Sequence, residues 1–348
     1  MTFHITCSTD DNYVQHCMAM LCSLFDNNKD KNFHVHLLIQ TLSEKSRAYI
    51  ISLCTKYGNH VTFYEIDEKL IGGFKLNDID FNGKKMYSIA TYFRFFLPSL
   101  LPQEVKRILY LDCDIVVLSD VFELYSFNMD NYGVAAVRDS TPYNSYHRYK
   151  MGLDLNHYAF CAGMMMINLD YWRKTNAQKK LIEYTTKPWK AVLMQDQDAL
   201  NYVFRDSWIH LPYKWGRTPL AVAPADKAQR LFDVIEYVSH PCIIHYAAHV
   251  KPWLDVKFPL QEHYWKYVAL SGFPTPQKTH ANKKTRRMIM KSLLRYRINK
   301  YIRPVLPDLL EMLFWDIYHF FSLIINIFRP KRLKEWLLKR WSQKYWVI

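Results

Sequence analysis

The chain has 348 residues, half of them apolar, which is enough for one large core or two modest ones. Glycine is scarce, at nine residues, and neither common glycine-rich phosphate loop occurs, which excludes those two modes of nucleotide binding. The seven cysteines form no Cys-x-x-Cys pair, which excludes a zinc or thioredoxin signature and predicts reduced thiols in a cytosolic protein.

The N-terminus lacks a basic segment followed by an apolar core, so we expect no secretory signal. Three stretches rich in apolar and β-branched residues are predicted strands: 3–7, 33–39 and 61–66. Two stretches with helical periodicity separate them: 13–27 and 43–56. Ser43 is the expected N-cap of the second helix. The β-α-β-α-β order predicts a parallel sheet covered by helices.

Further elements continue the same alternation. The predicted helices are residues 88–100, 177–186 and a helix that opens at 195–198. The predicted strands are residues 107–117, 132–137, 164–169 and 242–246.

The strand at 107–117 carries two carboxylates, Asp112 and Asp114. On a regular strand they point the same way, because the side-chain period is two. Burying two unpaired carboxylates so close together is costly unless a cation or water compensates them. Hard oxygen ligands suit Mn²⁺ or Mg²⁺, and ligands gather at the carboxyl ends of parallel strands. The alternative is a chance Asp-x-Asp at a strand-to-loop boundary.

Three other residues allow a structural and a functional interpretation. Arg94, among apolar residues, either snorkels to the surface or reaches an anion near the open end of the sheet. Asp196 either complements a helix dipole or belongs to a site. His245, at the end of a short strand, is either structural or a ligand.

The net charge of +14 is concentrated near the C-terminus. Residues 275–348 hold 17 Lys and Arg against four Asp and Glu, whereas residues 1–274 are nearly neutral. A turn-rich break, Ser-Gly-Phe-Pro-Thr-Pro, lies at 271–276. We therefore predict two parts, a catalytic domain over residues 1–272 and a basic tail over residues 273–348.

The tail carries two amphipathic stretches, 308–328 and 331–348. The first contains too many charges for a comfortable spanning helix. The second adds aromatic and basic side chains, which is typical of segments in the interface of anionic membranes. We expect peripheral attachment to the inner face of the cytoplasmic membrane. The alternatives are packing on the body and nucleic-acid binding, and nucleic acid is not expected because no recognisable module for it occurs.

In their order and spacing, the motifs resemble the retaining family 8 glycosyltransferases, specifically bacterial enzymes that extend lipopolysaccharide or lipooligosaccharide. The resemblance covers roughly residues 3–255 and rests on these pieces: Ser8-Thr9-Asp10-Asp11-Asn12-Tyr13, Tyr92-Phe93-Arg94, Leu109-Tyr110-Leu111-Asp112-Cys113-Asp114, Gly163 with Ile167-Asn168-Leu169, Gln195-Asp196-Gln197-Asp198, and 245–253. It implies an α/β, GT-A-type nucleotide-diphospho-sugar transferase fold, here followed by a helical C-terminal extension. It also implies a UDP-sugar donor, Mn²⁺ (or Mg²⁺) and transfer with retention.

The resemblance also implies a role for each motif residue. The residues implied to hold the uridine are Asp10, Asn12 and Tyr13. The implied metal ligands are Asp112, Asp114 and His245. Lys251 is implied to contact the diphosphate. Arg94, Asp139 and Asp196 resemble donor-sugar contacts, and Gln197 resembles the side chain nearest the anomeric carbon. An amide is a poor nucleophile, so we favour attack of the acceptor on the face that UDP leaves. Asp196 as a transient nucleophile is the competing mechanism.

Two positions depart from the family pattern. Cys161 stands where the family often has an Asn that helps to hold the sugar, and Ala248 stands where it usually has Gly. The leading hypothesis is a hexosyltransferase, with galactose ahead of glucose, acting on lipopolysaccharide or another surface glycan. The alternatives are a glucosyltransferase, an enzyme acting on a protein-bound glycan, and a non-catalytic, membrane-bound nucleotide-sugar binding protein.

Overall fold

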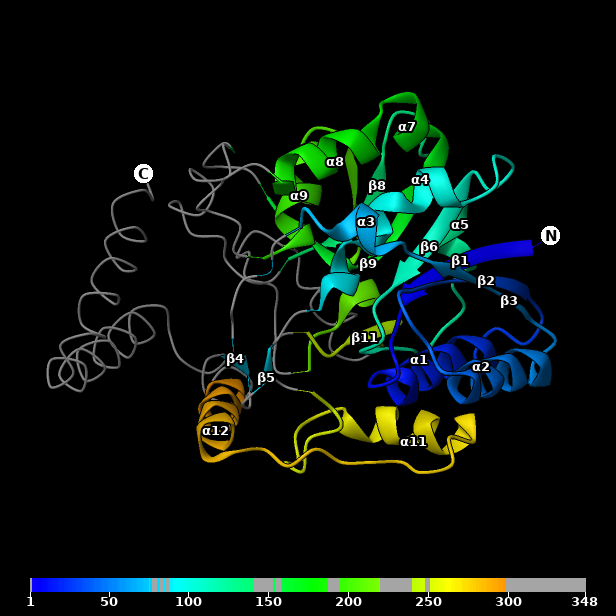
Figure 1. Ribbon diagram of the computed structural model, residues 1–348. Helices are drawn as coiled ribbons and strands as arrows, with labels where there is room; N and C mark the ends of the chain where they lie inside the picture. The colour runs from blue at the N-terminus through cyan, green and yellow to red at the C-terminus, as the bar shows by residue number, and fades with distance from the viewer. Residues whose placement is uncertain are drawn as a thin grey trace, which may run out of the picture.

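The computed structural model describes residues 2–74, 76, 80–81, 84–85, 88–139, 153, 158–186, 194–219, 240–247 and 251–297 (Figure 1). Ala248 and both amphipathic stretches of the tail lie outside the described residues. Within the described part of the chain, no helix is both long enough and apolar enough to cross a bilayer.

A seven-stranded sheet forms the centre of the fold (Figure 1). In spatial order its strands are β10 (Trp208–Leu211), β8 (Val134–Arg138), β9 (Phe160–Asn168), β6 (Arg107–Leu111), β1 (Thr2–Ser8), β2 (Asn32–Ile39) and β3 (His60–Glu65). Among these strands only β9 runs antiparallel to its neighbours, β6 and β8. The prediction of an α/β fold with a mainly parallel sheet is therefore confirmed.

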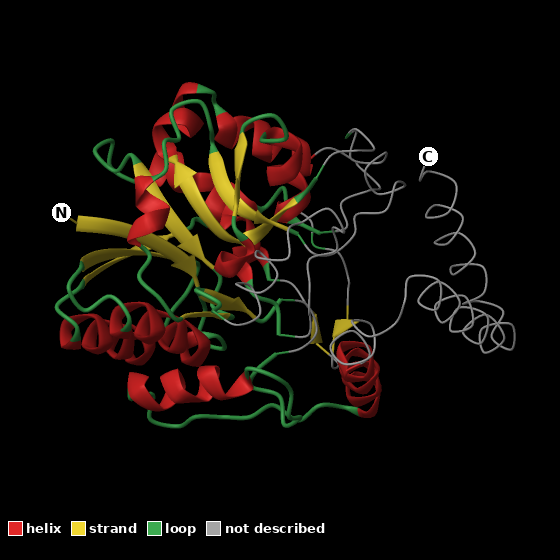
Figure 2. Cartoon of the chain, turned by 180° about the vertical axis from the view of Figure 1, so that it is seen from behind, coloured by secondary structure: helices red, strands yellow, loops and turns green. Residues whose placement is uncertain are grey.

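Helices cover both faces of the sheet (Figure 2). One hydrophobic core lies under α1 (Val14–Asp26), α2 (Glu44–Lys56) and α11 (Gln261–Ser271). The second lies under η1 (Ile89–Phe96), α4 (Leu97–Leu100), α7 (Leu169–Lys174), α8 (Ala177–Thr186) and α9 (Asp196–Val203). The remaining described helices are α3 (Glu68–Ile71), α5 (Phe122–Ser126), η2 (Tyr213–Gly216) and α12 (Lys283–Arg297).

Strand alternation explains the two cores. Ile5 and Cys7 of β1 face the first core, whereas Ile108 and Tyr110 of β6 face the second. The predicted N-cap is confirmed, because the Ser43 side chain accepts a hydrogen bond from the backbone of the first turn of α2.

The prediction of one strand over 107–117 is wrong. β6 ends at Leu111, and β7 (Ile115–Val117) pairs antiparallel with β11 (Ile243–His245) in a separate two-stranded sheet. Between them the Asp112 backbone N–H donates to Gly163 O at 2.8 Å, and the Asp114 carbonyl accepts from the Tyr246 N–H at 2.9 Å. These bonds direct the chain from one sheet to the other, so both carboxylates lie at the junction. A further small sheet pairs β4 (Asp80–Phe81) with β5 (Lys84–Lys85).

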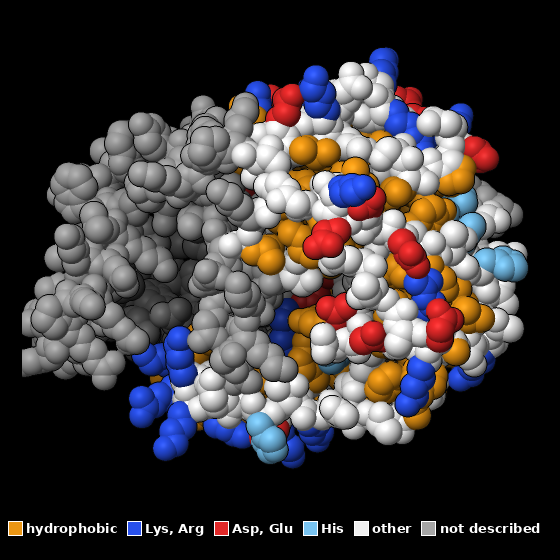
Figure 3. Space-filling model, viewed as in Figure 1, with side chains coloured by type: hydrophobic (Ala, Val, Ile, Leu, Met, Phe, Trp, Pro, Cys, Tyr) orange, Lys and Arg blue, Asp and Glu red, His pale blue; other side chains and the backbone are white. Residues whose placement is uncertain are grey.

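After α11 the chain returns along the body toward α12. Gln277 N–H donates to the Gln15 side chain at 2.7 Å, and Ile289 of α12 packs with Leu254. Lys and Arg side chains gather on the surface around α12 (Figure 3). The predicted boundary at residue 272 stays a prediction.

Candidate active site

The predicted site residues come from segments that meet at one edge of the sheet. β1, β6 and β8 run in the same direction, so Asp10, Asp112 and Asp139, which follow their ends, lie at the same edge. β9 runs the opposite way and starts at this edge, which adds Cys161 and Gly163. Residues far apart in the sequence are therefore brought together by strand direction alone.

Asp112, Asp114 and His245 form a group whose ligand atoms all lie within 4.8 Å of one another. His245 Nε2 is 3.3 Å from Asp114 Oδ1 and 4.0 Å from Asp112 Oδ2. Asp114 Oδ1 is buried and has no hydrogen-bond partner among the described residues. Two carboxylates and an imidazole suit Mn²⁺ or Mg²⁺, so these residues fit a divalent ion.

Because Gly163 has no side chain, there is room beside it for the Asp112–Asp114–His245 group. A Cβ at this position would lie 2.2 Å from His245 Cε1 and 2.9 Å from Asp112 Oδ2. Contacts of this length do not occur in folded proteins, so any larger residue at position 163 would displace the His245 ring.

Lys251 places a positive charge against the same group. Its Nζ donates to Asp114 Oδ2, and at 3.0 Å to the Tyr246 carbonyl. Burial alone would raise the pKa of Asp114, but Lys251 and His245 outweigh it and hold that pKa below its usual range. The Lys251 pKa is raised, because the attraction of Asp114 outweighs burial. Both side chains are therefore charged at neutral pH.

Arg94 is buried and does not snorkel. Its Nη2 donates to Asp112 Oδ1 at 3.0 Å, and its Nη1 lies 3.2 Å from Asp196 Oδ2 and donates to the Ala162 carbonyl at 2.7 Å. The guanidinium lies 3.8 Å from the centre of the Tyr110 ring. The snorkelling interpretation is therefore wrong. The anions that Arg94 reaches are carboxylates of the chain itself, and its contact with a donor sugar stays a prediction.

Asp196 begins α9 and is buried. Its carboxylate accepts a hydrogen bond from the Thr91 hydroxyl and pairs with Arg94. Burial raises the Asp196 pKa to about 6, because it outweighs the attraction of Arg94. The carboxylate is thus held by its neighbours rather than exposed.

The Gln197 amide is fixed at both ends. Its Oε1 accepts from the Ala162 N–H at 3.0 Å, and its Nε2 donates to Asp139 Oδ2 at 2.7 Å. Cys161, the residue before Ala162, has its Sγ 3.5 Å from His245 Nδ1. Of the residues predicted to contact the sugar, Cys161 and Arg94 therefore contact the Asp112–Asp114–His245 group directly.

The predicted uridine residues follow β1. Asp10 Oδ1 accepts from the backbone N–H groups of Asn12 at 2.9 Å and Tyr13 at 3.1 Å, which shapes the turn before α1. Asn12 is exposed. The Tyr13 ring packs at 83° against Trp253, whose ring lies 5.9 Å from Lys251 Nζ. Through this aromatic pair the end of β1 lies next to Lys251, whose contact with the diphosphate stays a prediction.

Two further residues, not assigned a role from the sequence, hold the carboxylates of the site in place. The Tyr110 hydroxyl donates to Asp112 Oδ1 at 2.8 Å, and Thr91 holds Asp196. Tyr110 had a signal, since it precedes Asp112 by two residues on a strand and so lies on the same face. Thr91 had none, because its partner is more than a hundred residues away.

A family model described as Glycosyl transferase family 8 matches residues 4–257. The chain belongs to this family. It is 26% identical over 280 residues to general stress protein A of Bacillus subtilis, covering 78% of this chain and 95% of that protein. It is 24% identical over 257 residues to a lipopolysaccharide 1,2-glucosyltransferase of Escherichia coli, covering 73% and 74%. Relatives from streptococci are longer, and the chain spans 26% to 60% of their length.

Among solved structures, the galactosyltransferase LgtC in complex with donor and acceptor sugar analogues matches with a TM-score of 0.68 and 23% identity. The match covers 82% of this chain and 99% of LgtC. This likeness confirms the predicted GT-A-type fold.

Proposed function

We propose that this family 8 protein is a retaining hexosyltransferase that uses a UDP-sugar and Mn²⁺ and extends lipopolysaccharide or another cell-surface glycan. The observation that carries the proposal is the Asp112–Asp114–His245 group with Lys251 against it. A binding protein needs no group at the anomeric face, and Gln197, which we assign to that face, is held at both ends of its amide. We favour galactose over glucose as the donor sugar. Both sugars are included in the test, because one relative is named a glucosyltransferase and LgtC a galactosyltransferase.

The chemistry requires charge to be neutralised where it develops. Breaking the sugar–phosphate bond leaves negative charge on UDP, and a divalent ion at Asp112, Asp114 and His245 supplies the compensating charge. Lys251 adds a second positive contact to the diphosphate. Asp10, Asn12 and Tyr13 position the uridine at the end of β1.

The sugar lies toward Arg94, Asp139, Cys161 and Gln197 in this proposal. Gln197 is oriented by Ala162 and Asp139, and it contacts the anomeric region without forming a bond. Asp196 is buried and pairs with Arg94, which supports a positioning role over that of a nucleophile. The acceptor therefore attacks from the face that UDP leaves, and a phosphate oxygen of UDP helps to accept its proton.

The test is UDP release by the purified full chain from UDP-galactose, UDP-glucose and UDP-N-acetylglucosamine, with Mn²⁺ and with chelator. We expect turnover of one hexose donor, abolished by chelator and lowered at least about 100-fold in Asp114→Asn. Asp130→Asn is the matched control, because Asp130 is an exposed carboxylate whose side chain is 76% accessible. If UDP and Mn²⁺ fail to bind the wild-type protein, the proposed function is wrong.

We also propose that the tail holds the protein on the inner face of the cytoplasmic membrane, near a lipid-linked acceptor. Support comes from the two amphipathic stretches that follow α12, residues 308–328 and 331–348, of which the second is basic and rich in aromatic side chains. Residues 277–289 contact the body, so the informative truncation ends at Arg297 rather than near residue 275. We expect the full chain to sediment with anionic vesicles and the truncated chain to bind them at least tenfold more weakly. Equal binding of both would contradict this role for residues 298–348.

A further inference from the structure

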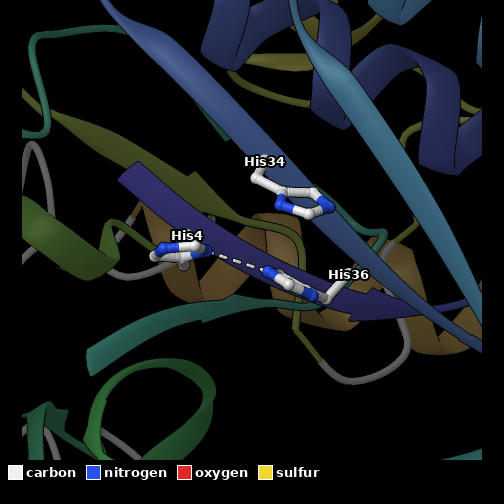
Figure 4. A group of neighbouring side chains, drawn as sticks. All are labelled: His4, His34 and His36. Atoms are coloured by element: carbon white, nitrogen blue, oxygen red, sulfur yellow. Dashed lines mark hydrogen bonds between the residues drawn. The ribbon is translucent and has the colours of Figure 1, made fainter. Parts of the chain in front are cut away.

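Three histidines gather on the sheet away from the candidate active site. His4 lies on β1, and His34 and His36 lie on β2. β1 and β2 are parallel with His4 opposite His34, and the strand period of two places His36 on the same face. This is the face opposite the core formed with α1 and α2, and Figure 4 shows the three rings turned toward one another.

The ring nitrogens are close enough to share one ion. One nitrogen from each ring lies within 4.8 Å of the other two. His4 Nδ1 is 2.9 Å from His36 Nε2, and the His34 and His36 rings stack with their centres 4.2 Å apart. Two imidazole nitrogens on a tetrahedral Zn²⁺ stand about 3.3 Å apart, given Zn–N bonds of about 2.0–2.1 Å. A widening of a few tenths of an ångström at His4 is therefore needed, together with a rotation of the stacked His34 ring that turns its lone pair toward the ion.

The other nitrogen of two rings already has a hydroxyl partner on β3. His36 Nδ1 is 3.0 Å from Tyr64 Oη, and His34 Nε2 is 2.8 Å from Thr62 Oγ1. When these nitrogens carry the proton and donate to the hydroxyls, His36 Nε2 and His34 Nδ1 have free lone pairs for an ion. This arrangement is the one that metal-binding histidines adopt, since the hydrogen bond on the outer nitrogen fixes the tautomer and the ring.

Burial and mutual repulsion keep the rings neutral. The pKa of each of the three histidines is lowered, chiefly by burial, and in His36 it falls to about 3. Neutral imidazole is the form that binds a metal. His4 and His34 are only half-buried, so an ion can reach the group from solvent.

We propose that His4, His34 and His36 form a second metal site, which binds a divalent ion such as Zn²⁺ through three imidazole nitrogens. Nitrogen ligands alone favour Zn²⁺, Ni²⁺ or Cu²⁺ over Mn²⁺, in contrast to the carboxylate-rich group at Asp112. The two sites are separate: Thr6 pairs with both His36 and Tyr110, so His36 lies two residues (about 7 Å) and His4 four residues (about 13 Å) back along the strands from the level of Asp112. The bound ion ties β1 to β2 in the middle of these strands, before the strand ends that carry the candidate active site.

The test is a Zn²⁺ titration of the full chain with Mn²⁺ in large molar excess over Zn²⁺, so that mass action keeps Zn²⁺ out of the carboxylate group. We expect one Zn²⁺ per chain, lost or weakened at least tenfold in His4→Ala and in His34→Ala. Tyr64→Phe keeps the ring but removes the hydroxyl that holds His36, and should weaken binding by about 10–100-fold. His60→Ala is the matched control, because His60 is exposed and pairs in register with His34, yet lies outside the group.

A second probe separates this site from the buried cysteines Cys7, Cys17 and Cys113, which also lie close together. Co²⁺ bound by imidazoles shows visible bands without the intense near-ultraviolet band of thiolate ligation. Zn²⁺ should also raise the melting temperature of the wild-type and His60→Ala proteins, and leave that of His4→Ala unchanged. Equal Zn²⁺ stoichiometry and affinity in wild type and His4→Ala, or a thiolate spectrum, would overturn the proposal.

Discussion

Replacing Gly163 by alanine is the sharpest perturbation of the proposed metal group that leaves its ligands unchanged. The new Cβ would stand 2.2 Å from His245 Cε1 and 2.7 Å from His245 Nε2. Carbon atoms in contact prefer about 3.5–4.0 Å, so the imidazole must move by more than about 1 Å. A misplacement of this size at a reacting centre costs about 100-fold in rate, which corresponds to about 2.7 kcal/mol.

The assay is UDP release with a titration of Mn²⁺. We expect kcat/KM to fall about 100-fold in Gly163→Ala and half-saturation to need more Mn²⁺, while the unfolding free energy changes by about 1 kcal/mol, at the low end for added core volume. Gly72→Ala is the control, because a Cβ there meets its nearest neighbour, Glu68 O, at 3.6 Å. A folded Gly163→Ala protein with kcat/KM and Mn²⁺ dependence within twofold of wild type would refute the reasoning.

Three further predictions concern single side chains. His16 stacks on Trp253 and its pKa is lowered to about 3, chiefly by burial, so its contribution to stability is present above pH 6.5 and is lost as pH falls toward 3. At pH 5 the free energy of unfolding measured with urea should be about 2 kcal/mol lower than above pH 6.5. His16→Gln should reduce this dependence of the unfolding free energy on pH. Alkylation of the half-buried Cys161 should block UDP release and be prevented by UDP with Mn²⁺, whereas Cys161→Ala should resist the reagent. Arg94→Met should destabilise the fold by about 3–5 kcal/mol, because it leaves two carboxylates without their shared partner, and equal urea midpoints would contradict this.

The positions of most site residues followed from the sequence because they depend on strand direction. Asp10 and Asp139 each come after a predicted strand, Asp112 lies toward the end of another, and parallel strands end at the same edge. The split of 107–117 into two strands could not be predicted in this way. The apolar pattern is the same on both sides of Asp112 and Asp114, and the partner of β7 is β11, more than a hundred residues further along the chain.

Arg94 shows a second limit of local patterns. Its neighbours in the sequence are apolar, which predicts only that the helix is buried. Whether the guanidinium turns to solvent or inward depends on Asp112 and Asp196, which enter from other elements. The cost of burying an unpaired charge makes the inward position acceptable only where both carboxylates are present.

The histidine group on β1 and β2 depends both on how strands lie beside one another and on residues from other elements. His34 and His36 are a visible His-x-His on a predicted strand, yet two imidazoles on one strand are ordinary surface residues by themselves. The third ligand, His4, comes from thirty residues earlier, and only the register of β1 against β2 sets it opposite His34. The hydroxyls that orient the rings come from a third strand, two and four residues after His60. A site built across three parallel strands is therefore determined by register, which a one-residue shift of β2 would abolish by turning both of its histidines to the other face.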